Sequence, residues 1–250
     1  MESPPPVDNG LSRDRAAVPV RNFLVLILAF GSGYIDAISY LGLGSVFTSN
    51  MTGNTVLLGL ALGEREGLAA LRSAIALVGY IGGVAVGSTI VDRGAKRVIW
   101  PSSVTVAFAA EFLVLLLFAA GGSFAGPTPG DFTLYPLIVL AAIAMGIQST
   151  AVRVLGVSGV ATTYITGTWT SLVSGLTRRL ASAASGTEAK QSGLPSGGTV
   201  IQAAVVLVYI LAAVAGGLTY TAWYLKSASV PAIGVAVVVV VALLRFRRYR

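Results

Sequence analysis

The sequence predicts an all-α fold: a polytopic bundle of six transmembrane helices, built from two inverted three-helix repeats that each contain a broken or re-entrant segment. The first observation behind this prediction is composition, because the chain is 55% apolar and only 11% charged, whereas soluble domains carry roughly 25% charged residues. The mean hydropathy is +0.82. The second observation is a polar motif that occurs twice, about 113 residues apart.

Six apolar runs approach the length of a spanning helix, which needs about 20 residues to cross ~30 Å of hydrocarbon. They are residues 22–43, 73–91, 98–120, 132–152, 200–225 and 230–244. Residues 1–20 contain the run Pro4-Pro5-Pro6 together with mixed charges and predict a disordered cytoplasmic tail. The first apolar run is too long for the core of a signal peptide, so we expect a retained helix at the start of a single transmembrane domain over residues 21–245.

The repeated motif has two parts. Gly33-Tyr-Ile-Asp-Ala matches Gly146-Ile-Gln-Ser-Thr, and Val46-Phe-Thr-Ser-Asn-Met-Thr-Gly-Asn-Thr-Val matches Val160-Ala-Thr-Thr-Tyr-Ile-Thr-Gly-Thr-Trp-Thr. Each copy follows an apolar run and precedes a short one, which predicts a duplicated fold with repeat one over about 21–121 and repeat two over about 132–245. Residues 178–199 lack apolar periodicity and predict a flexible cytoplasmic loop before the fifth helix.

The six-helix topology sorts the basic residues unequally. Fourteen of the 17 Lys and Arg fall on one side, and only Arg65, Arg72 and Lys226 fall on the other. Basic residues collect on the cytoplasmic flanks of membrane proteins, so we expect a multi-pass protein of the cell inner membrane with both termini in the cytoplasm. The net charge of +7 has the same explanation, and no nucleic-acid partner is expected.

The two motif segments, about residues 44–64 and 156–177, have two interpretations. If they re-enter the membrane as broken half-helices, each repeat has three crossings, and this odd number inverts the second repeat relative to the first. If they cross the membrane, the chain spans it eight times and the repeats are parallel. The charge distribution favours six crossings, because eight would move four basic residues outside: Arg93, Lys96, Arg97 and Arg153.

Two carboxyl groups lie within the apolar runs, where a charge is costly. Asp36 belongs to the first motif, and Glu111 lies near the middle of the third run. Because burial favours the neutral form of a carboxyl group, Glu111 is a candidate proton-coupling residue, or else a neutral link between helices. In the second motif Ser149 replaces the aspartate, and Arg153 follows. The side chain of Arg153 either extends to the lipid headgroups or pairs with a carboxylate or an anionic substrate.

Each motif ends in a polar turn before a short apolar run. Thr, Asn and Gly are good N-cap residues, so half-helices that start here would direct N–H groups and positive dipole ends toward a common point. Such a site would favour an anion or hydrogen-bond a polar neutral solute; alternatively, the turns are capped hairpins that only shape the fold. The candidate solute-binding residues are Asp36, Asn50, Thr52, Gly53, Asn54, Gln148, Thr166, Gly167 and Thr168.

Other residue types exclude or indicate further properties. With no Cys and no His, the chain has no disulfide, no thiol chemistry and no metal site of the usual ligands, and no cofactor is expected. It has neither a Walker-type phosphate loop nor a Gly-x-Ser-x-Gly motif, which excludes ATP-driven pumping by this chain alone and a Ser–His hydrolase centre. Gly79, Gly83 and Gly87 recur every four residues and predict close helix packing, within the chain or in a homo-oligomer.

The motif segments resemble the YoaK-type family, an uncharacterised group of bacterial membrane proteins defined as a domain of unknown function. The resemblance covers most of residues 20–245, and the string Asn50-Met-Thr-Gly-Asn is its most specific part. Where the family leads us to expect Gln-Asn-Ala, this chain has Gln148-Ser149-Thr150. The resemblance implies a multi-helix integral membrane protein and supplies neither a substrate nor a mechanism.

Three functions are open at this point. The preferred one is a small secondary transporter or permease for a small polar or anionic solute, with the lipid bilayer and this solute as partners. A passive channel would use the same turns to line a conduit. An intramembrane enzyme, which we do not favour, would use Asp36 and Glu111 as an acid–base pair, and this requires the two carboxyl groups to lie within hydrogen-bond reach.

Overall fold

The computed structural model describes residues 9–91, 98–126, 129–163, 165–184 and 197–246. Within these residues the chain forms helices and connecting segments and no strands. In order, the helices are α1 (Asn9–Gly42), α2 (Met51–Gly63), α3 (Gly67–Val91), α4 (Ser102–Phe124), α5 (Asp131–Leu155), α6 (Ile165–Ala184), α7 (Gly197–Trp223), the 3-10 helix η2 (Tyr224–Ala228) and α8 (Ser229–Arg245).

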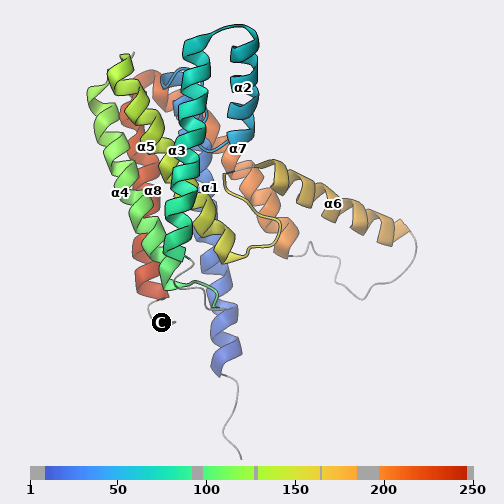
Figure 1. Cartoon of the computed structure of the whole chain (residues 1–250). Coiled ribbons are helices and arrows are strands. Elements are labelled where there is room, and N and C mark those ends of the chain that lie inside the picture. Colours follow the sequence, from blue (N-terminus) through green and yellow to red (C-terminus); the bar gives the residue numbers. More distant parts are fainter. Residues whose placement is uncertain (1–8, 92–97, 127–128, 164, 185–196, 247–250) are drawn as a thin grey trace, which may run out of the picture.

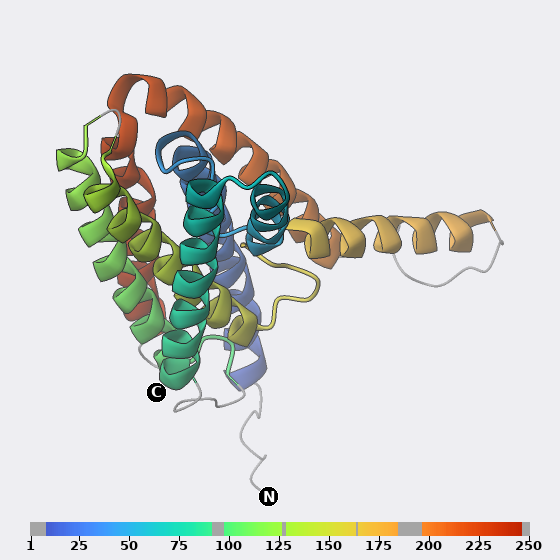
Figure 2. The same cartoon turned by 45° about the horizontal axis from the view of Figure 1, so that its top comes forward.

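The long helices form an upright bundle in which successive helices run in opposite directions (Figure 1). α1 rises, α3 descends, α4 rises, α5 descends, α7 rises and α8 descends, so α1 starts and α8 finishes at the same end of the bundle. Two helices depart from this pattern. The short α2 lies beside the upper part of α3, and α6 projects sideways from the bundle (Figure 2).

The lengths and surfaces of the long helices are those of a membrane protein. Five helical stretches among the described residues are long and apolar enough to span a bilayer: Ala17–Gly42, Gly67–Val91, Ser102–Phe124, Asp131–Leu155 and Gly197–Arg245. The last is 49 residues long and contains both α7 and α8, where the sequence predicts two separate runs. Large apolar side chains such as Val78, Leu117 and Leu218 are at least 60% exposed, as expected for surfaces that face lipid tails instead of water.

The predicted glycine stripe packs α3 against α5. A Cβ atom added to Gly83 would collide with the carbonyl oxygen of Ile143, and Gly79 and Gly87 also face α5. On the other side of this contact, Gly146 of α5 lies against the backbone of α3. Small residues therefore let the two helices approach closely, and the stripe is used for packing within the chain.

A second close pair is formed by α1 and α7. A Cβ atom at Gly33 of α1 would lie 2.5 Å from the carbonyl oxygen of Tyr209, and one at Gly216 of α7 would lie 2.8 Å from that of Tyr34. The first helix of each repeat is thus packed, through a motif glycine, against a helix of the other repeat. This exchange binds the two halves of the sequence into one bundle.

Two predicted irregular regions are partly helical. Residues 9–20, expected in the tail, form the first turns of α1, and Ala17 is already buried in the bundle. Residues 178–184, expected in the loop, continue α6, because the Ala- and Leu-containing sequence favours a helix. The remaining parts of these predictions, together with several basic residues, lie outside the described residues: 1–8, Arg93, Lys96, Arg97, Tyr164, 185–196 and 247–250.

The α3–α5 contact yields a test of the packing. Gly83→Ala should lower the melting temperature of the purified protein in detergent, because the added methyl group has no room and overpacking costs about 1–3 kcal/mol. Gly82→Ala is the matched control, since nothing lies within 4 Å of its Cβ position, and it should leave the melting temperature unchanged or raise it slightly. Equal melting temperatures for the two variants would contradict the close approach.

Candidate functional site

Two non-helical segments, residues 43–50 and 156–163, interrupt the bundle after α1 and α5. Each carries half of the repeated motif and leads into a short or projecting helix, α2 or α6. Backbone N–H and C=O groups at membrane depth need partners from the protein, because lipid tails offer none. The roles of the motif residues therefore follow from which side chains make hydrogen bonds to the backbone of these two segments.

Asn54 and Thr168 fold each segment back on itself in the same way. The side chain of Asn54 accepts a hydrogen bond from the backbone N–H of Phe47 (2.9 Å) and donates one to its carbonyl oxygen (2.5 Å). The hydroxyl of Thr168 accepts from the N–H of Ala161 (3.0 Å) and donates to its carbonyl oxygen (3.3 Å). In both cases the partner is seven residues earlier. We call these pairs the Asn54 clasp and the Thr168 clasp.

The other candidate residues of the two turns lie around the starts of α2 and α6. Asn50 is the N-cap of α2, as predicted, and its side-chain oxygen accepts the N–H of Gly53 at 3.2 Å. Thr52 and Thr166 are exposed on the surface, and Gly167 is half-buried. The polar turns thus split into buried side chains, Asn54 and Thr168, which close the segments, and exposed ones, Thr52 and Thr166, which face outward.

Asp36 anchors the first segment to α1. Its Oδ1 accepts the backbone N–H groups of Thr48 (2.9 Å) and Ser49 (2.7 Å), and its Oδ2 accepts the hydroxyls of Ser49 (2.6 Å) and Tyr209 (2.7 Å). The side chain is 4% exposed. Sequence reasoning missed Tyr209 of α7, although a tyrosine hydroxyl inside an apolar run needs a partner and is a usable signal.

Gln148 anchors the second segment. Its amide nitrogen donates to the carbonyl oxygen of Leu28 (3.1 Å) and to the hydroxyls of Ser32 (2.7 Å) and Thr162 (3.0 Å), sharing its two protons among them. The side chain is fully buried and links α5 both to α1 and to residues 156–163. Its Oε1 has no hydrogen-bond partner among the described residues.

The two segments meet inside the bundle. The hydroxyl of Ser49, already bonded to Asp36, lies 3.3 Å from the carbonyl oxygen of Thr163. Both residues are at most 2% exposed. Because α2 begins at Met51 and α6 at Ile165, each helix starts two residues after this contact. The sequence predicted that the two motif copies would come together, and Ser49 and Thr163 form this junction.

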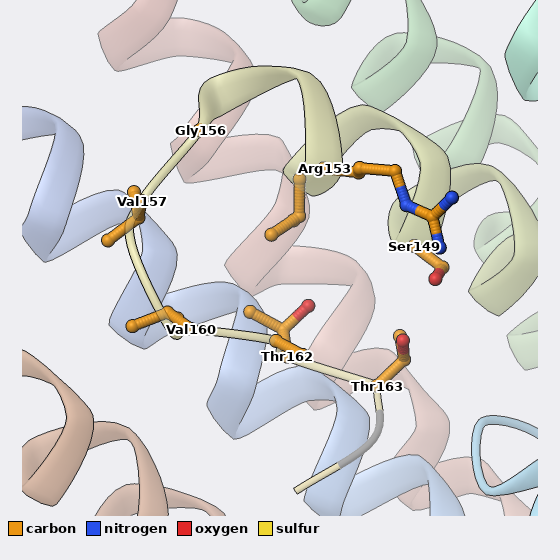
Figure 3. A pocket seen from close by; sticks show the side chains of 9 residues that line it. Ser149, Arg153, Gly156, Val157, Val160, Thr162 and Thr163 are labelled. Atoms are coloured by element: carbon orange, nitrogen blue, oxygen red, sulfur yellow. The ribbon is translucent and has the colours of Figure 1, made fainter. Parts of the chain in front are cut away.

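A pocket of about 180 Å³ opens beside the junction, between α5 and residues 156–163. All of its lining residues lie in or next to the second motif copy, so the candidate site belongs to this copy and not to the first. The lining residues are Ser149, Val152, Arg153, Gly156, Val157, Val160, Ala161, Thr162 and Thr163. Figure 3 shows the Arg153 guanidinium beside the Ser149 hydroxyl, facing the segment that carries Thr162 and Thr163, with Val157 and Val160 farther along that segment. Gly156 adopts a left-handed conformation (φ 61°) that ends α5 and turns the chain back toward the pocket.

Glu111 lies apart from this network. It is fully buried on α4, and neither carboxylate oxygen has a hydrogen-bond partner among the described residues. Asp36, in contrast, takes its four hydrogen bonds from the first segment and Tyr209. The two carboxyl groups therefore share no hydrogen bond.

Comparison with known proteins identifies relatives for most of the chain. The model of the family described as "Protein of unknown function (DUF1275)" matches residues 24–244. The UPF0700 transmembrane protein YoaK of Bacillus subtilis (strain 168) is 38% identical over 198 residues, which are 79% of this chain and 83% of that protein. No solved structure matches.

The Asn54 clasp yields a test of what holds the first segment. Asn54→Leu should lower the free energy of unfolding by about 1–3 kcal/mol, because it leaves the half-buried N–H and C=O groups of Phe47 without their partner. Thr55→Val is the matched control: its exposed hydroxyl bonds only to Met51 of the same helix, and its loss should change stability by less than about 0.5 kcal/mol. Thermal unfolding in detergent compares the two, and equal destabilisation would argue against the clasp.

Proposed function

Because the chain belongs to the DUF1275 family and is similar to a transmembrane protein, we propose that it is a small secondary transporter or permease for a small polar or anionic solute. The observation behind this proposal is the junction of two interrupted segments, Ser49 against Thr163, with a pocket of about 180 Å³ beside it. Transporters commonly place their binding sites where discontinuous segments of two repeats meet near the bilayer midplane.

We further propose that the two repeats are inverted. Ser49 and Thr163, which touch at the junction, occupy equivalent positions in the two motif copies, as do the residues of the two clasps. Contact between equivalent residues is expected when a two-fold axis passes between them. Figure 1 shows α1 and α5, the first helices of the two repeats, running in opposite directions, which favours an axis in the membrane plane.

Six crossings, by α1, α3, α4, α5, α7 and α8, fit this arrangement best. α2 has 13 residues and is therefore about 20 Å long, too short for ~30 Å of hydrocarbon. It lies beside the upper part of α3 in Figure 1, as a segment that re-enters from one side would. At the opposite end of the bundle, the described residues include Arg21, which bonds to the last residue of α5, Arg153 in the last turn of α5 and Arg245 in the last turn of α8. Basic residues at this end favour a cytoplasmic location for both termini.

The difference between the two halves suggests how access could alternate. In the first half the Asp36 carboxylate accepts the N–H groups of Thr48 and Ser49 and closes the segment onto α1. Ser149 is the equivalent residue of the second half; its hydroxyl makes no hydrogen bond with the described residues, and the pocket opens beside it. One closed half and one open half are what an inverted-repeat transporter shows when it faces one side of the membrane.

Glu111 is the candidate coupling residue. A buried carboxyl group without a partner is costly when charged and can remain neutral by holding a proton. Movement of α4 during the transport cycle would expose this group to water and allow the proton to leave. The two alternative functions make different demands on Glu111. A passive channel needs no proton-coupling group, and an intramembrane enzyme needs Glu111 to approach Asp36.

The topology has a direct test. The native chain has no cysteine, so single cysteines report the side on which they lie. Six crossings predict that Glu64→Cys and Arg245→Cys lie on opposite sides, so an impermeant maleimide added to intact cells should label Glu64→Cys and reach Arg245→Cys only after permeabilisation. If both positions react only after permeabilisation, the protein has eight crossings and parallel repeats.

Transport and coupling are tested together in proteoliposomes, with uptake of small carboxylates, small amides and phosphate measured with and without a pH gradient. Saturable uptake that the gradient accelerates is expected for the wild type. Glu111→Gln should retain downhill uptake and lose the acceleration by the pH gradient, because a glutamine side chain cannot bind and release a proton as a carboxyl group does. Glu64→Gln, at an exposed position, is the matched control and should behave as wild type.

The outcomes separate the candidate functions. Equal gradient dependence in the wild type and Glu111→Gln would remove the coupling role. Non-saturating flux with single-channel conductance would favour the channel, and no uptake of any of these solutes would count against both a carrier and a channel for this solute class.

A further inference from the structure

We infer that the pocket beside the junction binds a small organic monoanion through a carboxylate group, with Arg153 as its principal partner. The inference rests on the proposed function for its biological meaning, but it concerns binding, which can be measured without transport. The position of the pocket indicates only that its ligand is small and polar, whereas the lining residues indicate a class of solute, the small monocarboxylates.

The charge of the pocket indicates an anion. Arg153 is the only ionisable side chain in its lining, and that side chain makes no ion pair or hydrogen bond with the described residues. A guanidinium presents donors in a planar fork that matches a carboxylate. Figure 3 shows this fork beside Ser149, on the same side of the segment as Thr163.

The hydroxyls add further donors around the same space. The hydroxyl of Ser149 has no hydrogen-bond partner among the described residues, and this side chain lines the pocket. Thr162 and Thr163 contribute from the facing segment, and the Thr162 hydroxyl, which accepts from Gln148, retains its own proton for donation. A carboxylate accepts up to about four hydrogen bonds, so one guanidinium and these hydroxyls can satisfy it.

The number of cations limits the charge of the ligand. Arg153 is exposed at the mouth of the pocket. Its single guanidinium can compensate one negative charge, and a dianion such as hydrogen phosphate would keep a second charge that no cation of the lining pairs with. Asp36 cannot supply compensation because it is itself anionic or neutral. The pocket therefore suits a monoanion better than a phosphate group.

The remaining lining and the volume describe the rest of the ligand. Val152, Val157, Val160 and Ala161 give the pocket an apolar part. With about 30 Å³ for each water-sized group, a volume of about 180 Å³ holds roughly six such groups, which corresponds to a carboxylate with a short hydrocarbon chain. Butanoate has this size and chemistry and is the probe we choose.

Isothermal titration of the purified full-length protein in detergent tests the assignment. Butanoate should bind to the wild type, and butanamide, its neutral isostere, should bind at least about tenfold more weakly, the loss expected for a hydrogen bond to a charged group. Arg153→Gln should weaken butanoate binding by about tenfold or more. Arg178→Gln, on the projecting α6, is the control and should bind as wild type.

A second pair of variants guards against misfolding. Arg153→Lys keeps the charge without the fork and should give an intermediate affinity. Ser149→Ala removes a hydroxyl that bonds to nothing else in the described chain, so it should weaken butanoate binding severalfold while the melting temperature stays unchanged. Loss of binding in Ser149→Ala with unchanged stability supports the site even if Arg153→Gln fails to fold.

The outcomes distinguish this inference from the proposed function. Binding that depends on Arg153, without uptake in proteoliposomes, supports the anion site and counts against a transporter. Uptake of butanoate that Arg153→Gln leaves unchanged supports a transporter and overturns the site. Equal affinity for butanoate and butanamide, or a preference for phosphate, overturns the assignment to a monocarboxylate. Arg153 would then serve the lipid headgroups instead.

Discussion

The structure depends on one constraint: backbone that leaves the helix inside an apolar bundle must find its hydrogen-bond partners within the protein. Residues 43–50 and 156–163 are such backbone. In each segment one residue, Phe47 or Ala161, has both its N–H and its C=O bonded to the side chain seven residues later, Asn54 or Thr168. These clasps explain why a polar turn follows each apolar run. They also explain why the two most inward residues of the turns are buried and bonded to their own chain, so that they are less available to a solute than the sequence suggested.

A single difference between the two halves then decides where the bundle is open. In the first half a carboxylate at position 36 takes two backbone N–H groups and holds the segment against α1. In the second half Ser149 occupies the equivalent position, and Gln148, the residue before it, holds the segment through the hydroxyl of Thr162. The pocket lies beside Ser149. Under the proposed transport function, these unequal anchors would keep one half closed while the other is accessible.

Much of this could be predicted from sequence. The apolar runs coincide with the long helices, and the motif glycines mark the closest helix contacts, because only a residue without a side chain permits them. The meeting of the two motif copies also follows from their duplication. The sequence could indicate that Tyr209 needs a hydrogen-bond partner, but not that the partner is Asp36, which lies 173 residues away. Nor could the sequence show that Arg153 lines a pocket, because an arginine at a helix end has other uses.

The sequence by itself determined that this is a helical membrane protein with a polar motif that occurs twice, each time after an apolar run. Hydrophobicity and turn preference depend on short stretches of sequence, so they can be predicted from the chain alone. Only the tertiary structure decided which polar groups face inward, which are occupied, and which are left free. That division depends on contacts between α1, α5 and α7 across more than a hundred residues, and no local pattern specifies the partner of a buried donor or acceptor.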